Sequence, residues 1–127
     1  MQVIMVVDDS PVIRKVADRL LRDLGFIVIE AADGNEALNL CSHKMPDAIM
    51  VDWDLPTMSG TEFIRELRQL DNASDAKILY CTSEMMIAEM TRAKRAGASG
   101  FLMKPFDRNI LATKLSEVGI VPEPQAA

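Results

Sequence analysis

The stretch Asp47–Gly60 reads DAIMVDWDLPTMSG and contains an abrupt change from apolar to polar residues. Four apolar residues, 48–51, end at Asp52, and a short polar turn then leads to the start of a helix. An apolar run bounded in this way is typical of a buried parallel strand. Open α/β folds place their chemistry at the carboxyl edge of the sheet, and we expect Asp52 to lie there.

Strands and helices are predicted to alternate along the whole chain. The apolar runs that predict strands lie at 2–7, 26–30, 48–51, 77–81 and 99–103. A helix is predicted after each strand from its start and stop signals, which are Ser10-Pro11 to Gly25, a capping box at 33–36, a capping box at 59–62 with apolar positions to Leu70, Ser83 to Gly97, and Asp107 to Val118. This alternation predicts an α/β fold, (βα)5, with a doubly wound five-stranded parallel sheet. The periodicity does not define the strand order.

Length and composition predict an ordinary globular domain. The chain has 127 residues, of which 49% are hydrophobic and 26% charged. We expect a domain at 1–120 and a frayed tail at 121–127. The net charge of −5 and the pI of about 4.8 argue against a nucleic-acid surface. No membrane span or signal peptide is recognisable, so a cytoplasmic location is expected, with Cys41 and Cys81 as buried free thiols.

Polar residues follow four of the five predicted strands. They are, in chain order, Asp8-Asp9, Asp52, Thr82-Ser83 and Lys104. Because the carboxyl ends of parallel strands share one edge, we expect these side chains to gather there. Three carboxylates in one place repel one another, and Mg²⁺, which binds carboxylates, water and phosphate, would remove that repulsion. With a hydroxyl and an ammonium group able to contact phosphoryl oxygens, the set fits phosphoryl transfer to a carboxylate.

Each of these residues also has a purely structural explanation when taken alone. The acid pair could favour the N-terminus of the first helix, Thr82 could cap a turn, and Lys104 could be a solvated surface residue. Phe101 could simply belong to the core. The placement of the acid pair, Asp52, Thr82 and Lys104 at successive strand ends is what favours a functional site.

The residues Asp8-Asp9, Asp52, Thr82 and Lys104-Pro105, at this spacing, resemble the receiver domain of two-component response regulators. The resemblance runs from about Val3 to Val118. It implies a flavodoxin/CheY-like fold with the strand order 2-1-3-4-5. It also implies a stand-alone, single-domain response regulator, which is not a turnover enzyme and catalyses only its own phosphorylation and dephosphorylation. Its phosphoryl group would come from a sensor histidine kinase or a histidine phosphotransfer protein, in chemotaxis or in another phosphorelay.

The resemblance further implies a role for each acid. Asp52 would accept the phosphoryl group and contact Mg²⁺. Asp9 would bind the metal directly, Asp8 through water, and the backbone carbonyl of Asp54 would complete the ligands from the protein.

The remaining site residues would connect the phosphoryl group to a surface. Thr82 would hydrogen-bond a phosphoryl oxygen, and Lys104, before a cis bond to Pro105, would pair with the phosphoryl charge. Phe101 would turn inward when Thr82 moves. The surface that changes would be the fourth helix, fifth strand and fifth helix, where a downstream target protein binds.

Two other classes of function are compatible with parts of this sequence. Asp52-Trp53-Asp54 after an apolar strand also resembles the first motif of haloacid-dehalogenase-type phosphatases, although that motif normally follows the first strand and the Asp8-Asp9 pair would then lack a role. A receiver fold that is never phosphorylated and serves as a binding module is the other alternative. It would have no need of the acidic set with Lys104.

Further expectations concern residues near the site. Met85, Met86 and Met90 are predicted on the fourth helix, where an exposed methionine would suit an adaptable partner surface. Asp54 adds a negative charge two residues after Asp52, or merely favours the turn. Trp53 is expected to be partly exposed beside the metal site, so that its emission responds to Mg²⁺.

Overall fold

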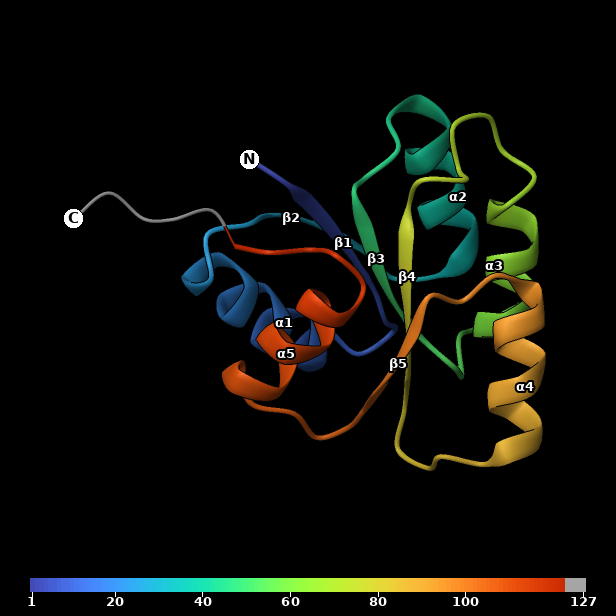
Figure 1. Ribbon diagram of the computed structural model, residues 1–127. Helices are drawn as coiled ribbons and strands as arrows, with labels where there is room; N and C mark the ends of the chain where they lie inside the picture. Colours follow the sequence, from blue (N-terminus) through green and yellow to red (C-terminus); the bar gives the residue numbers. More distant parts are fainter. Residues whose placement is uncertain (123–127) are drawn as a thin grey trace.

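A computed structural model describes residues 1–122, in which five strands and five helices alternate (Figure 1). The strands are β1 (Val3–Val7), β2 (Ile27–Ala31), β3 (Ala48–Asp52), β4 (Lys77–Thr82) and β5 (Gly100–Met103). The helices are α1 (Pro11–Asp23), α2 (Gly34–His43), α3 (Gly60–Leu67), α4 (Ile87–Ala96) and α5 (Arg108–Glu117). All neighbouring strands pair in parallel, in the order β2-β1-β3-β4-β5. The predicted fold class and strand order are confirmed.

The sheet separates two hydrophobic clusters. Helices α1 and α5 cover one face, and α2, α3 and α4 cover the other (Figure 1). Successive residues of β1 alternate between the clusters, with Ile4 and Val6 in the first and Met5 and Val7 in the second. Because both faces are covered by helices, the polar groups of the site are left to the carboxyl edge of the sheet.

Four predicted helix caps are present. The side chains of Ser10, Asp33, Ser59 and Asp107 each accept a hydrogen bond from the backbone N–H three residues later. These caps place the N-termini of α1, α2, α3 and α5 at the residues the sequence indicates.

The prediction for the start of the fourth helix was wrong. The N-cap of α4 is Met86, not Ser83, and it provides no side-chain hydrogen bond. Thr82 and Glu84 form a hydrogen-bonded turn, and Met86 N–H donates to the Glu84 carbonyl, so the loop continues to residue 86. Met85 and Met86 therefore precede the helix instead of lying on it.

Other element boundaries differ from the prediction by a few residues. Leu70 lies beyond α3 but still packs on the second cluster, and Val118 is the C-cap of α5. Asp52 belongs to β3 because its backbone pairs with Cys81 of β4. Both cysteines are buried and free, as predicted. The predicted tail lies outside the described residues from 123 onward. Within residues 1–122, no helix combines the length and the apolar character needed to span a membrane.

Candidate functional site

Acidic side chains from two neighbouring strands meet at the carboxyl edge of the sheet. Asp8 follows β1, and Asp52 is the last residue of β3, which pairs with β1. Asp8, Asp9 and Asp52 each offer a carboxylate oxygen, and these oxygens all lie within 4.8 Å of one another. Asp8 and Asp52 are only 4% and 7% exposed, whereas Asp9 is exposed. The structure thus brings together the three acids that the sequence predicts at this edge.

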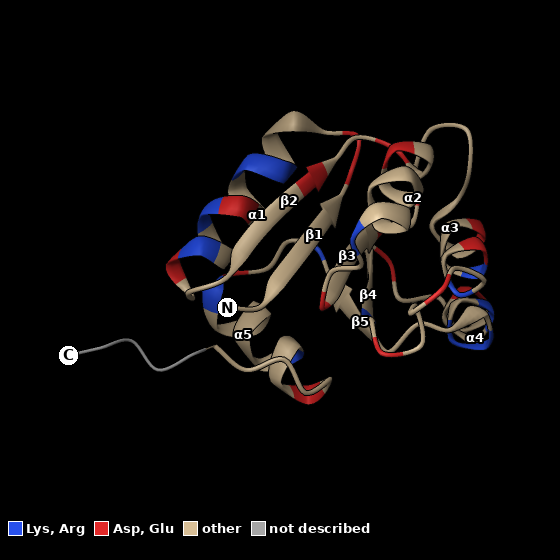
Figure 2. Cartoon of the chain, turned by 90° about the horizontal axis from the view of Figure 1, so that it is seen from above, with Lys and Arg blue, Asp and Glu red and all other residues tan. Residues whose placement is uncertain are grey.

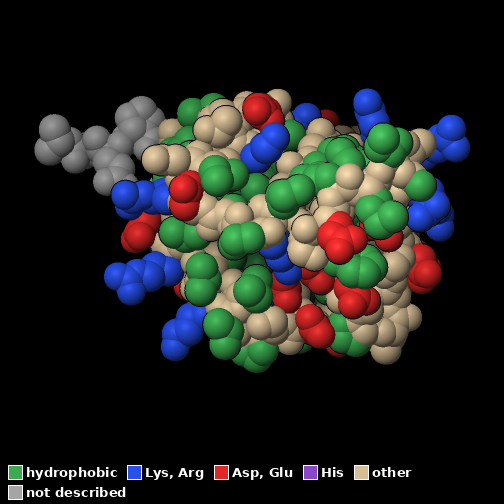
Figure 3. Space-filling model, turned by 90° about the horizontal axis from the view of Figure 1, so that it is seen from below, with side chains coloured by type: hydrophobic (Ala, Val, Ile, Leu, Met, Phe, Trp, Pro, Cys, Tyr) green, Lys and Arg blue, Asp and Glu red, His purple; other side chains and the backbone are tan. Residues whose placement is uncertain are grey.

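Lys104 reaches this acidic cluster from the end of β5. Its Nζ donates to Asp8 Oδ2 at 2.8 Å and to Asp52 Oδ1 at 2.5 Å. Its backbone N–H donates to the carbonyl of Thr82, and the Lys104–Pro105 peptide bond is cis. In Figure 3, which views the molecule from below, a basic side chain near the middle of the face is flanked by acidic side chains, with hydrophobic side chains around them.

Burial and hydrogen bonding shift the pKa values of both Asp52 and Lys104. Burial raises the pKa of Asp52, and the Lys104 hydrogen bond and charge, which act in the opposite direction, do not cancel that effect. Burial lowers the pKa of Lys104, but its hydrogen bonds to Asp52 and Asp8 outweigh burial, so that this pKa lies above its ordinary value. The single ammonium group of Lys104 is shared by the carboxylates of Asp8 and Asp52. The ionised form of Asp52 therefore lowers the stability of the folded protein.

Replacing Asp52 with asparagine is expected to raise the free energy of unfolding at pH 7 by about 1 kcal/mol. A carboxyl group with a raised pKa binds its proton more tightly in the folded chain than in the unfolded chain, so ionisation lowers stability above the folded pKa. The gain should shrink as the pH falls and vanish below about 3.8, the ordinary pKa of this group. Urea denaturation of both proteins in magnesium-free buffer measures it, and an Asp52→Asn protein less stable than the parent at pH 7 would contradict it.

Thr82 lies at the end of β4, and its hydroxyl forms hydrogen bonds with the backbone of Glu84 and not with the acidic cluster. It donates to the carbonyl of Glu84 at 2.9 Å and accepts from the Glu84 N–H at 3.1 Å. The residue is 2% exposed. If this hydroxyl donates to a group on Asp52, its hydrogen bond to the Glu84 carbonyl must break, which would loosen the loop that leads into α4.

Phe101 is partly buried on β5 and packs on the second hydrophobic cluster. Its ring contacts the buried Tyr80 ring edge to face, with centroids 6.0 Å apart and an interplanar angle of 75°. Tyr80 lies on β4 two residues before Thr82, so the aromatic pair is adjacent to the turn that holds the threonine hydroxyl.

The loop between β3 and α3 contacts the side chain of Asp52. Asp54 N–H donates to Asp52 Oδ2 at 3.2 Å, and the Asp54 side chain is exposed. Trp53 is 37% exposed, in agreement with the prediction. Gly60 lies against this loop: a Cβ atom at Gly60 would lie 2.6 Å from the carbonyl oxygen of Asp52 and 3.0 Å from the Trp53 Cα.

Sequence reasoning missed two residues that contact the site. Gly60 was recognised only as part of a capping box, and Arg14 was not singled out, although its Nη1 donates to the Asp8 backbone carbonyl at 2.6 Å. The only sequence signal for Gly60 is that a glycine, the smallest residue, immediately follows the capping Ser59. The only signal for Arg14 is that it is a basic residue near the start of the helix that follows the acid pair.

The oxygen atoms of the cluster fit a divalent cation of the magnesium type. Both Asp8 oxygens already accept hydrogen bonds, from Ser10 N–H and from Lys104, and Asp52 accepts from Lys104 and Asp54. Within residues 1–122 the Asp9 carboxylate accepts no hydrogen bond. Asp9 therefore offers free oxygens to a metal, and an all-oxygen set with surplus negative charge is what Mg²⁺ requires.

Comparison with known proteins identifies the class to which this fold and site belong. Residues 4–116 match the response regulator receiver domain. The chain belongs to this family. Among its relatives, the chemotaxis protein CheY of Pseudomonas aeruginosa is 33% identical over 116 residues, which are 91% of this chain and 94% of the relative.

Solved structures agree with this assignment. The chemotaxis protein CheY4 of Vibrio cholerae superposes with a TM-score of 0.90 and 36% identity, covering 93% of this chain and 98% of that protein. The receiver domain of the sensor histidine kinase PA1611 from Pseudomonas aeruginosa has a TM-score of 0.82 and 31% identity, covering 93% and 98%, and it holds a magnesium ion in its active-site cleft. The chain is therefore similar to CheY-like receivers over nearly its whole described length, and response regulator signalling is its function.

Proposed function

We propose that the protein is a phosphoacceptor switch in which Asp52 receives a phosphoryl group in a magnesium-dependent reaction. The observation that carries this proposal is the meeting of Asp8, Asp9 and Asp52 with Lys104 at one edge of the sheet. Asp9 would bind Mg²⁺ directly, together with Asp52 and the backbone carbonyl of Asp54, and Asp8 would contact it through water. When bound, the ion would neutralise negative charge on the phosphoryl oxygens and on the carboxylates that surround them.

The side chains of the protein supply position and charge. An Asp52 oxygen attacks phosphorus, a P–O bond forms, the P–N bond to the donor histidine breaks, and the imidazole leaves. Lys104, already 2.5 Å from Asp52 Oδ1, pairs with the negative charge of the phosphoryl group. The protein would act in this way only on itself, in the cytoplasm, where its two thiols stay reduced.

Thr82 would report the phosphoryl group to α4. To donate to a phosphoryl oxygen, its hydroxyl must give up its hydrogen bond to the Glu84 carbonyl, which would loosen residues 83–86. The N-terminus of α4 has no side-chain cap, whereas its C-terminal end is held by Arg68, which donates twice to the Gly97 carbonyl. The N-terminal end of α4 is thus the part that is free to move.

The moving end of α4 carries exposed apolar side chains that suit a target protein. Met86 is 54% exposed, Ile87 83%, and Met103 of the edge strand β5 44%. We propose the surface formed by α4, β5 and α5 as the target site, and α4 also carries basic residues (Figure 2). Amide exchange of residues 83–90 should change on phosphorylation, and unchanged protection would count against this surface.

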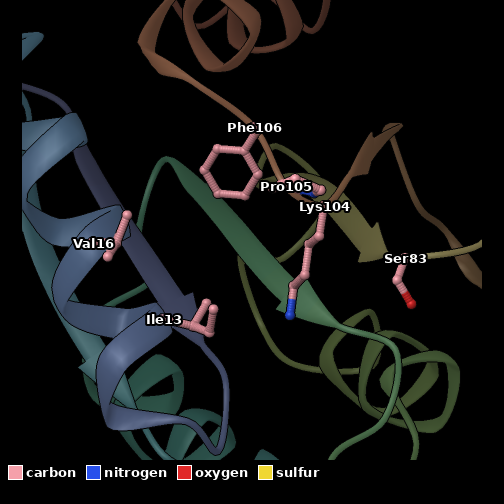
Figure 4. Close-up of a pocket in the computed structure, with 6 residues that line it drawn as sticks. All are labelled: Ile13, Val16, Ser83, Lys104, Pro105 and Phe106. Atoms are coloured by element: carbon pink, nitrogen blue, oxygen red, sulfur yellow. The ribbon is translucent and has the colours of Figure 1, made fainter.

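The phosphodonor would dock on a different surface, formed by α1 and the loop after β5. A groove of about 330 Å³ is lined by Ile13, Val16, Ser83, Lys104, Pro105 and Phe106 (Figure 4). Lys104 lines both this groove and the acidic cluster, so a histidine-bearing helix seated in the groove would lie beside Asp52. This continuity favours a histidine kinase or phosphotransfer protein as the occupant.

Intact mass measured with two phosphodonors tests the function and the donor surface together. We expect acetyl phosphate with Mg²⁺ to give one phosphoryl adduct, which is lost without Mg²⁺. Val16→Glu should leave this adduct unchanged, because a small donor needs no docking, and should slow transfer from a phosphorylated histidine protein about tenfold or more.

The other outcomes correspond to the alternatives. Steady phosphate release from simple phosphate esters without an adduct would indicate a phosphatase. The position of Asp52 at the end of the third strand instead of the first, and the family assignment, disfavour that alternative. Neither adduct nor release, with acetyl phosphate and with a histidine donor, would indicate a binding module that is never phosphorylated.

A further inference from the structure

We infer that Arg14, held in place by Glu30, is a positioning residue that orients the Asp8–Asp9 peptide for magnesium binding. This inference rests on the proposed function. Arg14 lies on α1, one helical turn after the N-cap Ser10, and is itself not a metal ligand.

The contacts of Arg14 connect the edge strand β2 to the acidic cluster. Its Nη1 donates to the Asp8 backbone carbonyl at 2.6 Å, and its Nε pairs with Glu30 Oε1 on β2 at 3.2 Å. The Arg14 side chain is 17% exposed, and that of Glu30 is 42% exposed. A guanidinium group can make both contacts at once because its donors form a rigid planar fork.

Every polar group of Asp8 is held by a different partner. The N–H donates to the Ala31 carbonyl, the two carboxylate oxygens accept from Ser10 N–H and Lys104, and the carbonyl accepts from Arg14. Three of these contacts hold the amide and the side chain. The Arg14 contact is the one that fixes the carbonyl, and with it the plane of the peptide bond that leads to Asp9.

Asp9 depends on this peptide because its carboxylate accepts no hydrogen bond within residues 1–122. Its side chain is exposed, so its direction is set by the backbone from which it projects. If the Asp8 carbonyl were released, the peptide plane could rotate and the Asp9 oxygens would spend less time within reach of Asp52. Groups that orient metal ligands in this way typically change metal affinity 10–100-fold when removed.

For the substitution Arg14→Met, the loss of charge and the loss of positioning predict opposite changes in Mg²⁺ affinity, so the inference can be tested. Arg14→Met removes a positive charge near a cation site, and electrostatics alone would then tighten Mg²⁺ binding. Positioning by Arg14 predicts that the dissociation constant for Mg²⁺ rises about tenfold instead. Arg14→Lys should not restore binding, because an ammonium group lacks the planar fork.

Magnesium titration of the unphosphorylated protein, followed by Trp53 emission and by calorimetry, measures this effect. Lys15→Met, at the adjacent exposed position of α1, is the matched control and should leave the dissociation constant within twofold of the parent. Glu30→Ala, which removes only the support of Arg14, should give a smaller rise of about threefold. Near-ultraviolet circular dichroism verifies that each variant is folded.

The initial rate of acetyl phosphate labelling provides the second readout. The Arg14→Met protein should be slow at low Mg²⁺ and approach the parental rate at saturating Mg²⁺. Unchanged or tighter Mg²⁺ binding in folded Arg14→Met and Glu30→Ala would overturn the inference while leaving the proposed function intact. A parent protein that binds no Mg²⁺ would overturn both.

Discussion

Replacing Gly60 with alanine is expected to lower the free energy of unfolding by about 3 kcal/mol. The added Cβ would lie 2.6 Å from the Asp52 carbonyl oxygen, and this obstacle is backbone at the end of a central strand, which cannot rotate away. The collision would be relieved by moving α3 or the end of β3, so Asp52 should also be labelled by acetyl phosphate at least tenfold more slowly. Urea denaturation and the initial rate of adduct formation measure the two effects.

Gly119→Ala is the matched control for this prediction. Gly119 has a φ of +86°, which an alanine tolerates poorly, but a Cβ atom there meets nothing within 4 Å. We expect a cost of about 1 kcal/mol from backbone strain alone, and no change in labelling. If the two substitutions cost the same, the close approach of Gly60 to β3 would not be what requires glycine at that position.

Replacing Lys104 with methionine is expected to cost about 2–3 kcal/mol of unfolding free energy at pH 7 without Mg²⁺. Asp8 and Asp52 are almost fully buried and would lose the ammonium group that both contact at 2.8 and 2.5 Å. The estimate is below that for a fully buried pair because the Lys104 side chain is 21% exposed. Saturating Mg²⁺ should recover part of the loss, since the ion supplies positive charge to the same carboxylates.

The pH dependence of this loss has a defined direction. The raised pKa of Lys104 means that its stabilisation is fully present below the ordinary lysine pKa of 10.5 and is lost as the pH rises through the folded value. On the acid side, protonation of the carboxylates removes the uncompensated charge, so the two proteins should converge there as well. Lys94→Met, on the exposed face of α4, should change stability by less than about 0.5 kcal/mol at pH 7. If the Lys104→Met protein were no less stable than the Lys94→Met protein, the ammonium group of Lys104 would not stabilise the fold by pairing with Asp8 and Asp52.

The sequence predicted most of the fold because its local signals are strong. Apolar runs buried on both faces identify parallel strands, and Ser10, Asp33, Ser59 and Asp107 cap the helices that they were expected to cap. The acids and Lys104 could be placed together because each follows a strand, and parallel strands end at one edge. The strand order, in contrast, came from a family resemblance, since periodicity carries no information about which strands are neighbours.

The parts that could not be predicted depend on contacts through space. Ser83 was expected to cap the fourth helix, but the Thr82 hydroxyl is bonded to Glu84 and delays the helix to Ile87. The closeness of Gly60 to β3 and the contact between Arg14 and Asp8 join residues on different elements. No pattern of spacing along the chain distinguishes these residues from an ordinary helix start and an ordinary surface arginine.

The location of the phosphoryl group decides whether Asp52 is the phosphoacceptor. After labelling with acetyl phosphate and Mg²⁺, borohydride reduction converts an acyl phosphate on aspartate into homoserine, which peptide mass mapping can locate. We expect homoserine at position 52 alone, and unlabelled protein carried through the same reduction should contain none. Homoserine at position 8, 9 or 54, or at no position in protein that carries the adduct, would contradict the assignment of Asp52 as the phosphoacceptor.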